Sequence, residues 1–524
     1  MKDENRVLVF SHDAREELLE GVNLLANAVK TTMGPSGQNV IIESADGPPI
    51  LTKDGVTVAR SINLKDSYKN LGVQLIKEAA SRTAEVAGDG TTTATVLSQA
   101  LFQEGMKLLT SGHNAVKVRE GMIAAKNEVL NKLDKMSRPV KGDEDIINVG
   151  TISANGDREI GEFLCRAMNA VGKDGIITVE EAKGFMTSLD VVDGLKLNRG
   201  FVSPYFVTNS DRLVCELDNP VVLLANQVIS SMGDLLPILE VCARDGKPLV
   251  IVADEVEGEV LKALVLNSIK GVLKVCVIRS PEFGNARVDT MSDLSLMFNT
   301  KSYSGAEDFP TKIEELGRVK KVIISRHESI FVTADSSDEI ESRVSAIKKM
   351  LQTSSLDSNE TDVLRRRLSN LAGAVAVLRV GGSTETELKE KKDRVEDALH
   401  ATQAAVEEGI LPGGGLALLR ASSKVRSNKS WDTDFYAGYN MLLQAIKAPA
   451  WNISVNCGES PDLIIHKLLE EEDFVGYDAR EKKFGNLLEL GIIDPKKVVR
   501  CALENSVAAA NSLLSVGCSI VYDE

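Results

Sequence analysis

The sequence lacks paired cysteines and grouped histidines. Its seven cysteines are widely spread, and none belongs to a CxxC pair. No group of histidines offers the spacing of metal ligands either. These absences predict a protein of a reducing compartment that has no structural zinc site.

Long apolar runs and dense basic regions are also missing. No apolar segment approaches the length of a membrane-spanning helix. The charged first residues are followed only by Val7–Phe10, which is too short for the apolar region of a signal peptide. The net charge of −15 argues against a general nucleic-acid surface, because such a surface needs clustered lysine and arginine. We therefore expect a cytoplasmic protein that binds neither membranes nor nucleic acid.

The common motifs of nucleotide-binding and hydrolytic enzymes are absent as well. The sequence contains no GxxxxGK[ST], GxGxxG, HExxH or GxSxG motif, so any nucleotide site must be of another kind. Such a site could use backbone amides to bind phosphates and carboxylates to hold Mg²⁺ or orient water. The separated glycine-rich loops and scattered acids that could supply these groups are 34–37, 88–90, 413–415, Asp54, Asp89, Asp397 and Asp494.

The stretch Gly88–Thr93 lies between two segments of helical apolar spacing. It should therefore end one helix and open the next. The start of a helix offers unpaired N–H groups and a positive dipole end, which suit an anion, and an acid beside them suits a phosphate carried with Mg²⁺. The alternative is a glycine-rich connector whose threonine caps the next helix. The residues alone leave both interpretations open.

Two further stretches are ambiguous on the residues alone. Asp397 lies off the apolar stripe of its predicted helix, which by itself indicates a solvated acid. The glycines 413–415 by themselves indicate a flexible turn.

The pattern along the chain indicates several domains. Its 524 residues are enough for two to four domains. The helical pattern breaks near residue 136, and between about 193 and 375 short apolar runs alternate with helical stretches, which is typical of an α/β layer. Helical pattern then dominates to the end. This order indicates that one domain is inserted into another.

Two predicted helices of the α/β section, near 235–241 and 256–269, are apolar over more of their circumference than one core-facing stripe requires. Either both are sandwiched between layers, or they expose an apolar groove that binds an apolar partner. Phe201, Tyr205 and Phe206 add aromatic surface nearby in the sequence.

From about residue 6 to residue 515, the chain resembles a divergent member of the group I (GroEL-type) chaperonin family. The resemblance rests on a set of motifs that occur together and in the family's order. The motifs that carry the resemblance are Thr32–Pro35, Lys53–Gly55, Gly88–Thr93, Gly150–Asn155, Arg394–Thr402 and Gly413–Gly415. The resemblance implies a multidomain chaperonin fold that combines α-helical and α/β parts. Its domains would be a helical equatorial ATP-binding domain (1–135 and 408–524), a small hinged intermediate domain (136–192 and 376–407) and an α/β apical polypeptide-binding domain (193–375).

The resemblance also implies a function. The protein would be an ATPase that captures non-native polypeptides on an apolar apical surface and assists their folding in a chamber. Its subunits would form seven-membered rings and bind a lid-type co-chaperonin. ATP, Mg²⁺ and K⁺ would be the cofactors.

The family's functional residues transfer to matching positions of this sequence. Asp89 would bind Mg²⁺, and Asp54 and Asp397 would position the attacking water. Thr32, Lys53 and Thr92 would surround K⁺. The remaining nucleotide contacts would be Met33, Gly34, Pro35, Gly88, Gly90, Thr91, Thr93, Gly414, Asp478, Ala479 and Asp494. The polypeptide-binding positions would be Phe201, Tyr205, Phe206, Leu236, Leu239, Leu261, Val265 and Leu266.

Several positions depart from the family pattern. Trp451 and Ser460 stand where the family commonly has an Arg and a Glu that join two rings, which leaves open a single or a double ring. Ala374 replaces a hinge glycine, and Asp478 replaces the usual Asn beside the adenine. A divergent paralogue or a virus-encoded version fits these changes. They motivate an alternative function, a chaperonin-fold binding scaffold with impaired or altered ATP cycling. A metabolic ATP-dependent transferase has little support, since no acceptor site stands out.

Overall fold

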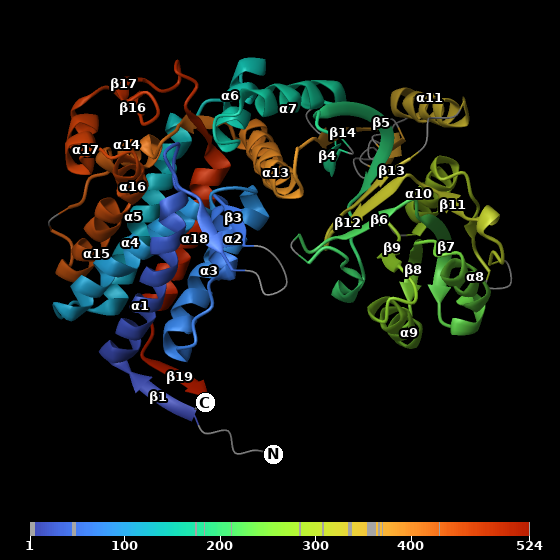
Figure 1. Cartoon of the computed structure of the whole chain (residues 1–524), viewed down its shortest axis with the longest axis horizontal. Helices are drawn as coiled ribbons and strands as arrows, with labels where there is room; N and C mark the ends of the chain where they lie inside the picture. The colour runs from blue at the N-terminus through green and yellow to red at the C-terminus, as the bar shows by residue number, and fades with distance from the viewer. Residues whose placement is uncertain are drawn as a thin grey trace. The chain divides into compact units, whose positions relative to one another are not determined.

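The computed structural model describes residues 6–522 except 44–48, 173–175, 183, 211, 282–283, 306–308, 334–337, 354–362, 365–366, 369, 372 and 429. The chain forms two compact units. Unit 1 comprises Met1–Arg166, Glu181–Thr187 and Val380–Glu524, and unit 2 comprises Ala167–Glu180 and Ser188–Arg379. Figure 1 labels their elements.

Unit 1 is mainly helical and is built from both ends of the chain. Its elements are β1 (Arg6–Phe10), α1 (Ser11–Val29), η1 (Lys30–Thr32), β2 (Val40–Ile42), β3 (Ile50–Thr52), α2 (Gly55–Ser61), α3 (Ser67–Ala87), α4 (Thr91–Thr110), α5 (Ala115–Met136), α6 (Asp143–Ser153), α7 (Arg158–Val171, which runs on into unit 2), α13 (Glu385–Glu408), β15 (Ile410–Pro412), α14 (Leu416–Ser423), α15 (Thr433–Ala445), α16 (Ala448–Asn456), α17 (Pro461–Glu470), β16 (Val475–Asp478), β17 (Lys483–Asn486), β18 (Ile493–Pro495), α18 (Lys496–Leu514) and β19 (Cys518–Tyr522).

The long helices of unit 1 form its core. Helices α1, α3, α4 and α18 pack side by side, and α5 packs against α15 and α18 (Figure 1). Their apolar faces bury Leu25, Leu97, Met122, Tyr439 and Leu503 completely. Strand β1 pairs antiparallel with β19, so the beginning and the end of the described chain lie together.

Unit 2 is an α/β structure. Its elements are β4 (Ile176–Glu181), β5 (Ser188–Leu197), η2 (Pro204–Phe206), β6 (Cys215–Asp218), β7 (Val221–Ile229), α8 (Met232–Arg244), β8 (Leu249–Val256), α9 (Gly258–Ile269), β9 (Val275–Arg279), α10 (Gly284–Met297), β10 (Ser302–Tyr303), η4 (Ile313–Glu315), β11 (Gly317–Arg318), β12 (Lys321–Ile324), β13 (Ser329–Val332), α11 (Asp338–Thr353) and β14 (Ala374–Val380).

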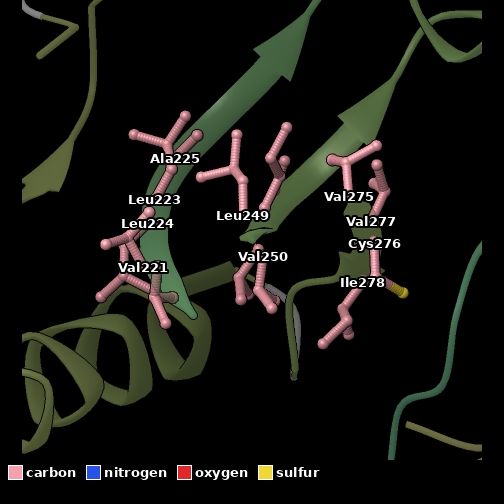
Figure 2. Close-up of a cluster of buried hydrophobic side chains, with 14 of the residues drawn as sticks. Val221, Leu223, Leu224, Ala225, Leu249, Val250, Val275, Cys276, Val277 and Ile278 are labelled. Carbon is pink, nitrogen blue, oxygen red and sulfur yellow. The ribbon is translucent and has the colours of Figure 1, made fainter. Parts of the chain in front are cut away.

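Two sheets organise unit 2. One has the strand order β10-β7-β8-β9, with β11 also paired to β7, and the other has the order β4-β14-β5-β13-β12-β6. Strands β7, β8 and β9 are parallel neighbours joined by α8 and α9. Figure 2 shows their apolar side chains gathered in the core, as expected for strands buried on both faces. The predicted α/β section is therefore confirmed.

The predicted three domains map unevenly onto these two units. Of the segments within the predicted intermediate domain (136–192 and 376–407), α6 and α13 belong to unit 1, whereas β4 except its last residue belongs to unit 2. The three-domain boundaries therefore stay a prediction. Among the described residues, no helix combines the length and the apolar character that crossing a membrane requires.

Candidate functional site

The loop between α3 and α4 is tightly enclosed. Gly88 and Gly90 have positive φ angles of 73° and 92°, which glycine adopts without strain. A Cβ added at Gly88 would lie 2.0 Å from Cβ of His400, and one at Gly90 would lie 2.8 Å from Cγ1 of Val498. Helices α13 and α18 thus approach the loop so closely that both positions need glycine. The prediction that Gly88–Thr93 ends one helix and opens the next is confirmed.

Asp89 lies between these two glycines. Its carboxylate accepts hydrogen bonds from the Gly90 N–H and from Oγ of Ser153, the latter at 3.0 Å. Burial raises the pKa of Asp89 above the ordinary 3.8, and repulsion by Asp54 adds to this shift. Ser153 belongs to the Gly150–Asn155 motif, but nothing in the sequence alone indicates that it bonds this acid.

Asp54 caps the short helix α2. Its carboxylate accepts hydrogen bonds from the Val56 N–H at 3.0 Å and from the Thr57 N–H at 2.7 Å. A Cβ added to the next residue, Gly55, would lie 2.2 Å from Oγ1 of Thr92. The beginnings of α2 and α4 therefore touch, and the Lys53–Gly55 and Gly88–Thr93 motifs meet in space.

Asp397 lies on α13, which packs against α6 and α18. The buried stripe of this helix includes Val395 and Leu399, as the periodicity predicts. Asp397 itself is only partly exposed, and burial raises its pKa well above 3.8. Repulsion by Asp89 and then by Asp54 raises the pKa further. Its environment is therefore that of an acid facing other acids, which is unlike the solvated acid that helix periodicity alone predicts.

Asp494 lies at the third glycine-rich loop. It pairs with Leu411 where β15 and β18 run antiparallel, and a Cβ added at Gly413 would lie 3.0 Å from its Oδ1. Gly414 and Gly415 both have positive φ angles. Burial raises the pKa of Asp494 from 3.8 to about 7, and Asp89 contributes by repulsion. The flexible turn predicted at 413–415 thus lies against an acid of the same site.

Together, Asp54, Asp89, Asp397 and Asp494 form what we call the acid cluster. The raised pKa values of Asp89, Asp397 and Asp494 come from burial and from other acids, and no basic side chain is among the causes. Carboxylates whose pKa values are raised by burial and by one another suit a cation.

The spacing of the acid cluster limits the kind of metal site that it can form. Among the described residues, only His12, Asp13 and Glu16, all exposed on α1, bring three potential ligand atoms within 4.8 Å of one another. The acid cluster therefore does not form a complete protein cage. Mg²⁺ commonly takes one or two carboxylates together with phosphate oxygens and water, so a site of this kind fits it.

Thr91 supplies a second indication of a ligand. It is the first residue of α4 and only 5% exposed, and its Oγ1 has no hydrogen-bond partner among the described residues. A buried hydroxyl without a partner is costly in a folded protein. Its place at a helix N-terminus, next to a glycine-rich loop, fits an anion such as phosphate.

The Thr32–Pro35 loop is fixed from another helix. Asn456 of α16 donates hydrogen bonds from Nδ2 to the carbonyls of Lys30 and Met33, both at 2.9 Å. Gly34 has a positive φ of 80°. Because η1 packs against α4, this loop lies beside the helix that begins at Thr91. Sequence reasoning missed Asn456 as a residue that positions the loop.

Asp478 and Ala479 lie at the hairpin formed by β16 and β17, and both are buried. Oδ1 of Asp478 accepts hydrogen bonds from the N–H groups of Arg480 at 2.9 Å and Glu481 at 3.1 Å. This carboxylate therefore organises its own loop. Its predicted contact with a nucleotide stays a prediction.

A second candidate surface lies on unit 2, where η2 and α8 both pack against α9. Tyr205 of η2 is 66% exposed and Leu266 of α9 is 55% exposed. Leu236 of α8 is exposed as well. The partly buried Leu261 and Val265 of α9 pack against the core beneath. We call the surface formed by these residues and Ile269 the apolar helix face. Ile269, exposed at the end of α9, was not among the predicted polypeptide-binding positions.

Two predicted members of this surface are corrected. Phe206 is completely buried and Leu239 is 6% exposed, so both belong to the core of unit 2. Phe206 follows Tyr205 directly in the single turn η2, where neighbouring side chains cannot point the same way. Phe201 is partly buried and also packs against the core. Helices α8 and α9, whose apolar residues cover more than one core-facing stripe, thus fit both interpretations of the sequence. They pack against the core and also expose apolar side chains.

The helical unit with its acid cluster and the α/β unit with its apolar helix face have the architecture of a chaperonin. The comparisons with known proteins agree. The model of the TCP-1/cpn60 chaperonin family matches residues 25–523. The chain therefore belongs to the TCP-1/cpn60 chaperonin family.

Solved structures show the same fold. The chain is similar to the chaperonin gp146 from the bacteriophage EL 2 (Pseudomonas aeruginosa), crystallised in the presence of ATP-BeFx. In one crystal form the identity is 24%, the TM-score is 0.69, and the match covers 99% of this chain and 100% of the phage protein. In a second crystal form the identity is 23% and the TM-score is 0.63, with 99% of both chains covered.

Proposed function

We propose that this chain is the subunit of an ATP-hydrolysing chaperonin that captures non-native polypeptides and assists their folding in a ring-shaped chamber. The observation that carries the proposal is the acid cluster, in which Asp397 from α13 faces Asp89 beside a glycine-rich helix start. The crystallisation of the related phage chaperonin with ATP-BeFx supports a nucleotide as the ligand.

The residues present fit Mg·ATP. Asp89 would hold Mg²⁺, while the amides of Gly88–Thr93 and the Thr91 hydroxyl would bind phosphate oxygens. The Thr32–Pro35 loop would contact the phosphates from the side opposite to Gly88–Thr93. When bound, Mg·ATP supplies the phosphoanhydride to be cleaved and a metal ion that offsets phosphate charge.

The ends of the site would be completed by the remaining predicted residues. The adenosine part would lie against Gly414, Ala479 and Asp494, with Asp478 organising the adjoining loop. A K⁺ ion would be surrounded by Thr32, Lys53 and Thr92. The contact between Gly55 and Thr92 supports the K⁺ site, because it joins two of the segments involved.

Asp54 and Asp397 would orient and deprotonate the attacking water. Asp54 is held rigidly by its hydrogen bonds to the start of α2, so its direction is fixed. Burial and the neighbouring acids raise the pKa of Asp397, and a raised pKa suits a carboxylate that accepts a proton from water. Because Asp397 lies on α13, hydrolysis would depend on α13 lying against the Gly88–Gly90 loop between α3 and α4.

The apolar helix face would capture clients. Apolar side chains that are exposed on adjacent helices bind other apolar segments without sequence preference. Seven subunits would form a ring, and a lid-type co-chaperonin would cover the same face. Client binding, the ring and the lid rest on the family's general properties.

The test is to measure ATP hydrolysis and client refolding by the full chain. We expect Mg²⁺-dependent hydrolysis that is stimulated by K⁺ over Na⁺, and refolding of a denatured enzyme that requires ATP. Client binding with refolding that is independent of ATP, or absent, would favour the binding scaffold instead. Negative-stain imaging with and without ATP would give the ring number.

A further inference from the structure

The turn between α6 and α7 has a defined structure. Its residues Asn155 and Gly156 both have positive φ angles, of 57° and 90°. The Gly156 N–H donates to the carbonyl of Thr151 at 2.7 Å, which closes the end of α6. Asp157 then accepts a hydrogen bond from the first turn of α7. The turn therefore has one backbone conformation that a second group can recognise.

Arg480 reaches this turn from the loop between β16 and β17. Its Nη2 donates a hydrogen bond to the carbonyl of Asn155 at 3.0 Å. A Cβ added at Gly156 would lie 2.0 Å from the same nitrogen, so the guanidinium lies directly on the glycine. Gly156 thus meets two requirements, a positive φ and a close approach.

The Asp478 carboxylate directs Arg480 toward the turn. It accepts hydrogen bonds from the backbone N–H groups of Arg480 and Glu481, which fixes the beginning of the loop. A second contact reinforces this docking, because a Cβ added at Gly491 would lie 2.7 Å from Cγ of Asn148 on α6. The segment from α6 to the turn after it is therefore contacted at two places, by Arg480 before β17 and by Gly491 after β17.

The same region also contacts the Gly88–Gly90 loop between α3 and α4. Ser153, the last residue of α6, donates its hydroxyl to Asp89 at 3.0 Å. Helix α6 in turn packs against α13, which carries Asp397. If the function proposed above is right, Asp89 and the β16–β17 loop lie at opposite ends of the bound nucleotide, and one turn spans both.

We propose that Arg480 is a positioning residue that latches the α6–α7 turn to the β16–β17 loop and so keeps Ser153 on Asp89. The latch favours the arrangement in which α6 and α13 lie against the nucleotide site. Arg480 does not touch the reacting atoms. It acts by raising the fraction of molecules in which Asp397 is in place, so it affects turnover more than nucleotide binding.

Hydrogen exchange and ATPase kinetics of the full chain test the latch. In Arg480→Ala, we expect backbone amides of residues 150–158 to exchange about two- to ten-fold faster, as losing one exposed hydrogen bond predicts. The kcat for ATP should fall by a similar factor of about two to ten, while KM should change by less than about two-fold. Arg480→Lys, which keeps the positive charge and one donor nitrogen, should give intermediate exchange.

The matched control is Lys483→Ala, which removes the same charge from another exposed position of the same hairpin. It should leave exchange at 150–158 unchanged. Unchanged exchange in Arg480→Ala would overturn the latch, and so would an equal increase in Lys483→Ala, because charge and not contact would then be the cause. A wild-type chain without ATPase activity would contradict the proposed function, but the exchange result, which needs no nucleotide, would still decide the latch.

Discussion

The acid cluster of unit 1 and the apolar helix face of unit 2 depart from a stable protein surface in opposite ways. The first gathers carboxylates that raise one another's pKa, and the second leaves Tyr205 and Leu266 largely in water. Neither arrangement stabilises the isolated chain. Each makes sense when a ligand completes it, a cation with phosphates in one case and an apolar polypeptide in the other. The comparison teaches that this chain keeps its two costly features in separate units.

The strongest way to sharpen the comparison is to contrast two adjacent aromatic residues of unit 2. Phe206→Ala should lower the free energy of unfolding by about 3–5 kcal/mol, because it empties a fully buried position. Tyr205→Ala should change it by no more than about 0.5 kcal/mol, since this side chain is exposed. Urea unfolding measures both. Equal losses would show that Tyr205 belongs to the core and not to a binding surface.

Asp89→Asn should produce the next largest effect, in unit 1. Loss of a residue that only hydrogen-bonds to a metal ligand lowers the affinity for the metal by up to about 100-fold. Asp89 would be a direct ligand, so its loss should weaken Mg·ATP binding by at least about that factor. Titration calorimetry with and without Mg²⁺ measures it. Glu85→Gln, an exposed acid on the last turn of α3, is the control and should bind normally. Unchanged Mg²⁺ dependence in Asp89→Asn would assign the metal to another acid.

Leu266→Ser should weaken capture of a denatured client by about five- to ten-fold, since part of an apolar side chain's burial energy is lost. Val288→Ser, at an exposed apolar position of α10 outside the apolar helix face, serves as the control. Sedimentation of client with the chaperonin measures capture. Equal loss in both variants would mean that capture depends on general surface hydrophobicity.

The smallest effect concerns pH. Asp494 has a pKa of about 7 in the fold against 3.8 as its ordinary value, so the folded state holds this proton more tightly than the unfolded chain. Its contribution to stability is therefore lost as pH rises through this range. Without nucleotide and Mg²⁺, Asp494→Asn should melt a few degrees above wild type at pH 8, and the difference should shrink at pH 5.5. A difference that grows toward pH 5.5 would contradict the assigned cause.

Much of the fold followed from local patterns. The alternation of apolar runs with helical stretches predicted the α/β section that contains β7, β8, β9 and β12, and the glycine-rich loop predicted the break between α3 and α4. These features depend on neighbouring residues, so the sequence contains them directly. The boundaries between the units were not predictable in this way, because α6 and α13 join unit 1 through contacts between distant segments.

The site was predictable only in part. On helix periodicity alone, Asp397 indicated a solvated acid, and only the joint motifs assigned it a role. Ser153 and Asn456 were missed because single polar side chains carry no pattern that shows which loop they will bond. Phe206 was misplaced because a one-turn helix gives no periodicity from which to tell the buried side of an aromatic pair.

In the proposed function, Asp397 acts with Asp89 on a bound nucleotide. Single-turnover hydrolysis of prebound ATP by Asp397→Ala tests it most directly. We predict that the variant binds Mg·ATP like the wild type but hydrolyses it about 10²–10⁴-fold more slowly, as expected for loss of a general base. Hydrolysis at the wild-type rate in this variant would contradict the account.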